Sequence, residues 1–201
     1  MPPVSHLPPG GPTRSATMTD LSAEKSLFSL AQIQHLMRVE FSRAQRYGYP
    51  IACLMIAVDR LGHLRDMYGY EAKEVIIDSL VDLLKSATRN SDFLGRMADD
   101  RLLAVVPHTG PSGIRSLSRR LVNQVHQLDF DSDGRRIPIT VAIGGSYDGS
   151  DEGDESTDQR TMFFDTLLQA SEEALDDAVA AGGDRVVFLT PAEMGGAGSG
   201  S

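Results

Sequence analysis

An arginine and a carboxylate at a short spacing are the residues of this chain best suited to binding a ligand. Arg89 and Asp92 are separated by two residues. A guanidinium fork can donate two hydrogen bonds to guanine O6 and N7 or to a phosphate, and it can stack on a base. A carboxylate can accept hydrogen bonds from the N1–H and N2–H edge of guanine. Side chains of these two types can therefore contact a phosphate or a nucleobase. A purely structural interpretation, in which Asp92 caps or pairs locally with Arg89 or Arg96, stays open.

The stretch that follows this pair is predicted to form a hairpin. Apolar residues lead into and out of a polar tip at 98–101, and Pro107 ends the second run. Short apolar runs on both sides of such a tip are typical of two paired strands.

The elements around the hairpin alternate between helix and strand patterns. Apolar residues at three- and four-residue spacing indicate helices, and uninterrupted apolar runs indicate buried strands. The predicted helices are residues 27–47, 71–87, 112–128 (capped by Ser112) and 161–181, and the other predicted strands are residues 51–58, 137–145 and 185–189. Together they predict an α+β fold with helices flanking an antiparallel-centred sheet.

Composition limits the class of protein. The chain has 201 residues, 41% of them hydrophobic, enough for one ordinary core. Its net charge of −9 argues against binding a nucleic acid polymer, which would need a basic face. No apolar run approaches the roughly 18 residues of a membrane span, and no signal-peptide pattern opens the chain, so a cytoplasmic protein is expected. Cys53 lies within an apolar run and is expected to be a buried hydrophobic residue.

Both ends of the chain lack apolar periodicity. Residues 1–26, rich in Pro, Gly and Ser, are predicted to be disordered, residues 27–190 to form one domain, and residues 191–201 to be a flexible tail. The acidic segment 148–158 has a glycine where an EF-hand has one, but Gln159 stands at the twelfth position, which favours a solvated insertion. The histidines show no paired metal-binding spacing. We therefore predict no metal and no cofactor.

The order strand, polar break, helix and hairpin resembles the GGDEF domain of diguanylate cyclases, over about residues 27–189. The hairpin tip takes the place of the family signature, which reads Ala98-Asp99-Asp100-Arg101-Leu102 here. The resemblance implies the fold of that family and its nucleotidyl-cyclase relatives, a ferredoxin-like palm of antiparallel strands with flanking helices. Function has to be argued from the site, because a fold hosts many activities.

Active members of the family are similar to two-metal phosphoryl-transfer enzymes. The signature of this chain departs from theirs at most positions. Family positions for metal, phosphate or guanine contacts are filled here by Ala57, Arg65, Glu74, Ala98, Asp99, Arg101, Val179 and Gly183. Ala57 cannot ligate a metal, and Asp99 sets a carboxylate where a glycine would let a polyphosphate approach. Only the third signature position keeps its acid, Asp100. The resemblance thus implies a degenerate domain that is not an enzyme.

Arg89 and Asp92 match the family's Arg-x-x-Asp motif, which lies five residues before the signature and binds the bacterial second messenger cyclic di-GMP. The family adds an arginine from the helix after the hairpin, and the register places it at Arg120. The resemblance implies a cyclic di-GMP receptor that signals to a protein partner in trans, and it leaves a homodimer open. The alternative is a nucleotide-free interaction scaffold that docks through the helix at 27–47 or the family's dimer surface.

Overall fold

The computed structural model describes residues 30–132, 135–149 and 164–190. The segment 1–26 that was predicted to be disordered, most of the acidic segment 148–158, and the tail 191–201 lie outside the described residues. Among the described helices, none combines the length and apolar character needed to cross a membrane.

A five-stranded sheet forms the centre of the fold, in the order β2-β3-β1-β6-β7. Every neighbouring pair is antiparallel except β6 and β7, which are parallel. The prediction of an α+β fold with an antiparallel-centred sheet is therefore confirmed. The strands are β1 (Ile51–Val58), β2 (Phe93–Arg96), β3 (Leu102–Pro107), β6 (Val141–Asp148) and β7 (Arg185–Phe188).

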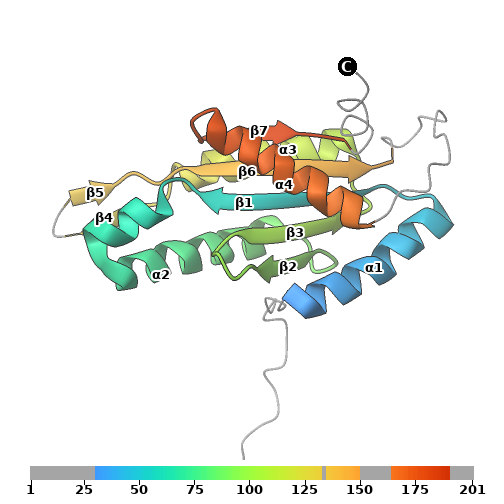
Figure 1. Ribbon diagram of the computed structural model, residues 1–201, viewed down its shortest axis with the longest axis horizontal. Coiled ribbons are helices and arrows are strands. Elements are labelled where there is room, and N and C mark those ends of the chain that lie inside the picture. Colours follow the sequence, from blue (N-terminus) through green and yellow to red (C-terminus); the bar gives the residue numbers. More distant parts are fainter. Residues whose placement is uncertain (1–29, 133–134, 150–163, 191–201) are drawn as a thin grey trace, which may run out of the picture.

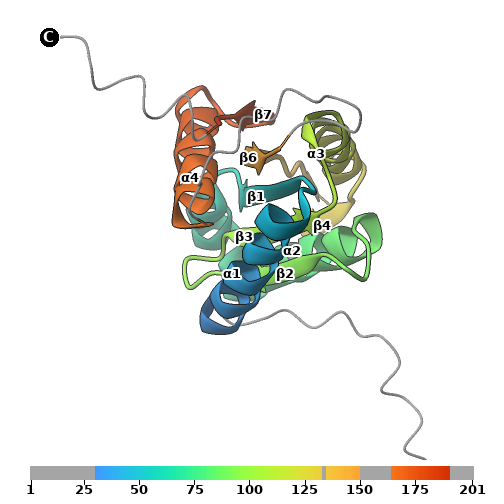
Figure 2. The same cartoon turned by 90° about the vertical axis from the view of Figure 1, so that its right-hand side faces the viewer.

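In the described part of the chain, four helices cover the two faces of this sheet (Figure 1, Figure 2). They are α1 (Leu30–Tyr47), α2 (Leu61–Ala87), α3 (Pro111–Val125) and α4 (Phe164–Ala180). Apolar residues of α2 and α3 pack with Leu54 and Ile56 of β1 on one face, while those of α1 and α4 pack with Cys53 and Met55 on the other. β1 is buried on both faces, as its uninterrupted apolar run predicts, because successive side chains of a strand point to opposite sides.

The helix predicted at 71–87 begins ten residues earlier, at Leu61. Gly62 and Gly69 weaken its helical pattern, and Gly69 has φ 89° and ψ 171°, which separates two helical segments. The first segment is helical because Leu61, Leu64 and Tyr68 pack against the core below it. That packing is a tertiary contact, so the local pattern did not reveal it.

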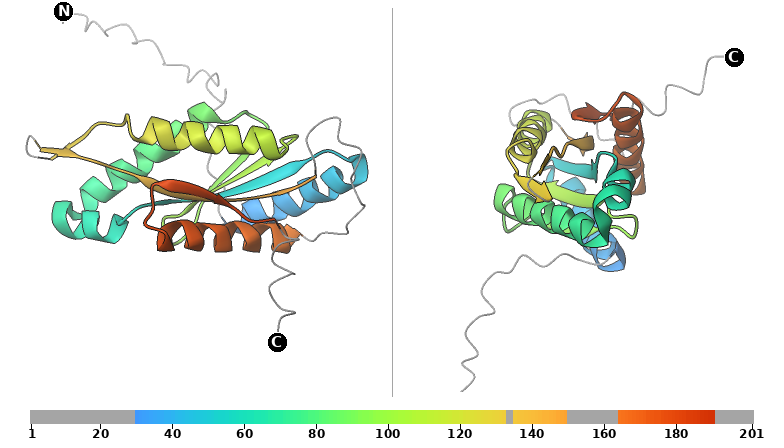
Figure 3. Two further views of the ribbon diagram at one scale, coloured as in Figure 1. Left: turned by 90° about the horizontal axis from the view of Figure 1, so that it is seen from above. Right: turned by 90° about the vertical axis from the view of Figure 1, so that its left-hand side faces the viewer.

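Two further predictions were wrong in detail. The strand predicted at 137–145 is split, because β5 (Arg135–Ile137) ends before Pro138, which has no N–H to donate to a strand partner. β5 pairs instead with β4 (Phe130–Ser132), and this small hairpin extends past the sheet near the start of α2 (Figure 3). Ser112 does not cap α3: the cap is Gly110, and Pro111 opens the helix, where its fixed φ is favourable.

Candidate functional site

The Arg89–Asp92 segment forms a tight turn between the end of α2 and the start of β2. The Oδ2 atom of Asp92 accepts a hydrogen bond from the backbone N–H of Arg89 at 2.6 Å, and the N–H of Asp92 donates to the Arg89 carbonyl at 3.0 Å. The Asp92 side chain is only 5% exposed, whereas Arg89 is exposed. The local capping role of Asp92 is therefore present in the structure, and Arg89 is the exposed residue of the motif.

Arg120 reaches this turn from the neighbouring helix α3. Its Nη2 donates to the carbonyl oxygen of Ala87, two residues before Arg89, at 2.9 Å. Within the described part of the chain, neither Arg89 nor Arg120 has a carboxylate within ion-pair distance. Two exposed guanidinium groups therefore lie close to a single buried carboxylate, that of Asp92, and such groups can donate charge-assisted hydrogen bonds to an anion.

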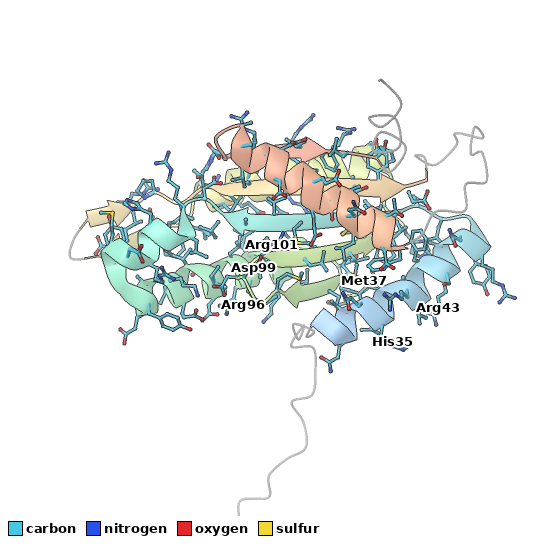
Figure 4. All side chains as sticks on the ribbon, in the orientation of Figure 1. His35, Met37, Arg43, Arg96, Asp99 and Arg101 are labelled. Atoms are coloured by element: carbon cyan, nitrogen blue, oxygen red, sulfur yellow. The ribbon has the colours of Figure 1, made fainter. Side chains whose placement is uncertain are left out.

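The tip of the hairpin holds the residues at the signature positions. Arg101 donates from Nε to Oδ2 of Asp99 at 2.6 Å, and its Nη2 lies 3.8 Å from Oε1 of Glu172 on α4. Figure 4 shows Arg96, Asp99 and Arg101 gathered in this region. Leu102 begins β3 and is buried in the core on the α2 and α3 side. The cationic charge of Arg101 is thus neutralised by protein carboxylates.

Four charged side chains form an ion-pair network between α2 and this tip. Lys73 Nζ lies 2.5 Å from Oδ2 of Asp100 and 3.2 Å from Oε1 of Glu74. Arg96 donates from Nε to Oδ1 of Asp100 at 3.0 Å and from Nη2 to Oε1 of Glu74 at 3.1 Å. Hydrogen bonds from Arg96 and Lys73 lower the pKa of Glu74. Burial by itself raises the pKa of Asp100, but hydrogen bonds from Lys73 and Arg96 outweigh it, so this pKa is lowered as well.

The sequence analysis did not identify the role of Lys73 or the ion pairs of Arg96. Asp92 was expected to cap or pair with Arg89 or Arg96 in the structural interpretation; it caps Arg89, and Arg96 pairs with Glu74 and Asp100. Residues 74 and 96 lie on different elements, so no local spacing signals their contact. Sequence reasoning could have noted only that a lysine directly precedes the position of a guanine-reading acid.

Two further positions near the family's nucleotide contacts, Arg65 and Asp59, are engaged with other parts of the protein. Arg65 forms an exposed ion pair with Asp66 at 2.9 Å rather than facing Glu74. Asp59, two residues after Ala57, accepts hydrogen bonds from the Thr140 hydroxyl at 2.6 Å and from the backbone N–H of Asp184 at 2.8 Å. The Asp59 carboxylate therefore ties the start of β6 and β7 to the end of β1.

A cleft of about 400 Å³ opens beside the first turns of α2. Asp59, Arg60, His63 and Tyr68 are among the residues that line it, and neither Arg89 nor Arg120 does. Among the described residues, no group of three or more His, Cys, Asp or Glu side chains is placed to hold a metal ion.

Comparison with known proteins gives a consistent family assignment. The family model described as "Diguanylate cyclase, GGDEF domain" matches residues 26–185. Diguanylate cyclase A of Treponema denticola is 25% identical over 177 residues, which cover 88% of this chain and 44% of that protein. The chain thus spans less than half the length of this relative.

Solved structures agree on the fold. The diguanylate cyclase SiaD of Pseudomonas aeruginosa, solved in complex with its activator SiaC, superposes with a TM-score of 0.72 at 20% identity, covering 82% of this chain and 60% of SiaD. The GGDEF domain of DgcB from Caulobacter crescentus, solved in complex with c-di-GMP, has a TM-score of 0.72 at 14% identity, covering 89% of this chain and 98% of that one.

Proposed function

The chain belongs to the GGDEF domain family, and from this premise we propose that it is a receptor for cyclic di-GMP that does not synthesise the dinucleotide. The ligand binds over the Arg89–Asp92 turn, with Arg89 and Arg120 as its cationic contacts. Asp92 stabilises the turn, because it is buried and its carboxylate accepts a hydrogen bond from the backbone N–H of Arg89. The bound state is passed on to a protein partner.

The observation that carries this proposal is the position of Arg120 beside the Arg-x-x-Asp turn. Arg89 and Arg120 lie 31 residues apart in the sequence, and the hydrogen bond from Arg120 to Ala87 brings them to one place on the surface. Each guanidinium can donate hydrogen bonds to a phosphate or to O6 and N7 of guanine, and cyclic di-GMP contains two of each group. The DgcB structure in complex with c-di-GMP supports the ligand class.

The state of the hairpin tip supports the second half of the proposal, the lack of cyclase chemistry. Transfer of a nucleotidyl group needs cations that face the phosphates of GTP. Here Ala57 offers no metal ligand. Arg101 is paired with two carboxylates, those of Asp99 and Glu172, so this ion-pair group carries a net negative charge that would repel a polyphosphate. These charges oppose GTP at the place where the family transfers phosphoryl groups.

Calorimetric titration with cyclic di-GMP tests the receptor function. We expect the Arg89→Ala and Arg120→Ala variants to bind about tenfold or more weakly than wild type, since each loses a charge-assisted hydrogen bond. Arg119→Ala is the matched control, because Arg119 is exposed on the same helix, directly beside Arg120. Equal affinity in all four proteins would contradict the proposal, and so would the absence of any heat from wild type.

Incubation with GTP and Mg²⁺ or Mn²⁺ tests the second half. We expect the product analysis to detect no cyclic di-GMP when the protein is used at the concentration of the calorimetric titration. Product that scales with protein concentration and disappears in Asp100→Asn would show a working cyclase and overturn this half of the proposal.

The alternative function is a nucleotide-free interaction scaffold, and the outer surface of α1 favours it. Val39 is 42% exposed and Tyr47 is 70% exposed on this helix, although its opposite side is buried in the core. The SiaD structure with its activator shows that a protein of this fold has been solved with a protein partner. A scaffold predicts no thermal shift at about 100 µM cyclic di-GMP, where a 1 µM site would add about 2.7 kcal/mol of stability.

A further inference from the structure

The GGDEF resemblance implies divalent cations at the hairpin tip, held by acids at the positions of Ala57 and Asp100. The residues present do not fit such a site. Ala57 has no ligand atom, and both carboxylate oxygens of Asp100 are engaged, Oδ2 by Lys73 and Oδ1 by Arg96. We infer that the side chains of Lys73 and Arg96 replace a bound divalent cation at Asp100, so that the protein holds its hairpin tip without metal.

The charges of the network balance without an added ion. Two carboxylates, Glu74 and Asp100, face two cations, Lys73 and Arg96, and each cation contacts both carboxylates. The Lys73 side chain is only 12% exposed, so its ammonium lies between the two carboxylates rather than in solvent. A divalent ion placed here would have to displace Lys73 and would meet Arg96 at close range.

The same contacts fix the geometry of the tip. Asp100 has φ 66°, a left-handed conformation that a residue with a side chain rarely adopts. Its N–H donates to the carbonyl of Met97 at 3.1 Å, and the N–H of Met97 donates to the carbonyl of Arg101 at 2.8 Å. With its carboxylate tied to α2 through Lys73, Asp100 is held on both its backbone and its side chain. Lys73 thereby connects α2 to the hairpin tip through the side chain of Asp100.

This inference rests on the half of the proposed function that excludes cyclase chemistry, and it does not involve Arg89 or Arg120. Its test measures thermal stability and Mn²⁺ binding, and it measures neither cyclase activity nor cyclic di-GMP binding. A failed test therefore leaves the receptor function standing, and a failed cyclic di-GMP titration leaves this inference standing.

The experiment compares thermal unfolding with and without millimolar Mn²⁺ in wild type, Lys73→Met and Lys85→Met. Lys85 is the matched control: it lies on the same helix and forms a looser ion pair, 3.9 Å from Asp82. We expect Mn²⁺ to leave the midpoints of wild type and Lys85→Met unchanged. Lys73→Met should unfold at a lower temperature, and Mn²⁺ should recover part of that loss by binding the carboxylate oxygens that the ammonium has left.

A double variant separates the charge of Lys73 from its packing. Lys73→Met combined with Asp100→Asn should regain most of the lost unfolding temperature, because no unpaired carboxylate remains. Mn²⁺ that stabilises wild type as much as Lys73→Met would overturn the inference. The inference would also be overturned if Lys73→Met is destabilised and Mn²⁺ does not raise its unfolding temperature, since Lys73 would then be an ordinary ion-pair partner. Should Lys73→Met not fold, electron paramagnetic resonance of free Mn²⁺ with wild type decides: binding that is lost in Asp100→Asn refutes the inference, and no binding supports it.

Discussion

Replacing Asp92 by alanine is expected to destabilise the fold, whereas replacing Arg89 is expected to affect only the ligand. Asp92 carries a buried carboxylate that accepts the backbone N–H of Arg89 at 2.6 Å and so closes the turn between α2 and β2. Arg89 is exposed. Replacing Asp92 is therefore expected to lower the free energy of unfolding, whereas replacing Arg89 is not.

The magnitude follows from the type of hydrogen bond. A bond to a charged group contributes about 1.5–3 kcal/mol, and Asp92→Ala loses that contribution. For a domain of this size, about 2–4 °C per kcal/mol gives a fall of roughly 3–12 °C in the unfolding midpoint. Asp92→Asn keeps a carbonyl acceptor for the Arg89 N–H, and since a neutral bond contributes about 0.5–1.5 kcal/mol, it should lose about half as much. Arg89→Ala should stay within about 0.5 kcal/mol of wild type, as exposed substitutions do.

Urea unfolding followed by circular dichroism measures these differences, with cyclic di-GMP absent. The expected order of stability is wild type, equal to Arg89→Ala, then Asp92→Asn, then Asp92→Ala. If Asp92→Ala unfolds at the same urea concentration as Arg89→Ala, then the carboxylate does not hold the turn and the reasoning is refuted. In that case a loss of ligand affinity in Asp92→Ala would point to direct contact with the ligand.

Three further predictions concern the core and the hairpin tip. Gly144→Ala should cost about 1–3 kcal/mol or more in urea unfolding, because the added methyl would overlap the α4 backbone; Gly62→Ala, which meets nothing within 4 Å, is its control and should be neutral or stabilising. Met37→Ala should cost about 2–5 kcal/mol, since this α1 residue is fully buried, and an unchanged urea midpoint would mean that α1 is not part of the core. Glu74 and Asp100 have lowered pKa values, so their ion pairs contribute fully above about pH 4 and are lost as pH falls through the lowered values. Urea unfolding between pH 7 and pH 3 should show that loss, and the Glu74→Gln, Asp100→Asn double variant should show a flatter profile; identical profiles would contradict it.

Most of the fold could be predicted because its patterns are local. The uninterrupted apolar run of β1 indicated a strand buried on both faces, and the three- and four-residue spacing of apolar residues indicated α1 and α4. The exceptions have physical causes of their own. The first segment of α2 contains two glycines and is helical through its packing on the core, and Pro138 divides what an apolar pattern alone reads as one strand.

The candidate site divides in the same way. The residue types and spacing of Arg89 and Asp92, and the register of Arg120, were available from the sequence, and so were the changes at the signature positions. The local cap of Asp92 on Arg89 was one of the interpretations that the sequence left open. Two features were decided only by the tertiary structure: the contact of Arg120 with the end of α2, and the pairing of Lys73 with Asp100. Lys73 and Asp100 lie 27 residues apart on different elements, and their contact depends on how α2 crosses the hairpin. Periodicity and spacing report which side of its own helix or strand a residue occupies, whereas the meeting of two such sides is set by packing across the whole core.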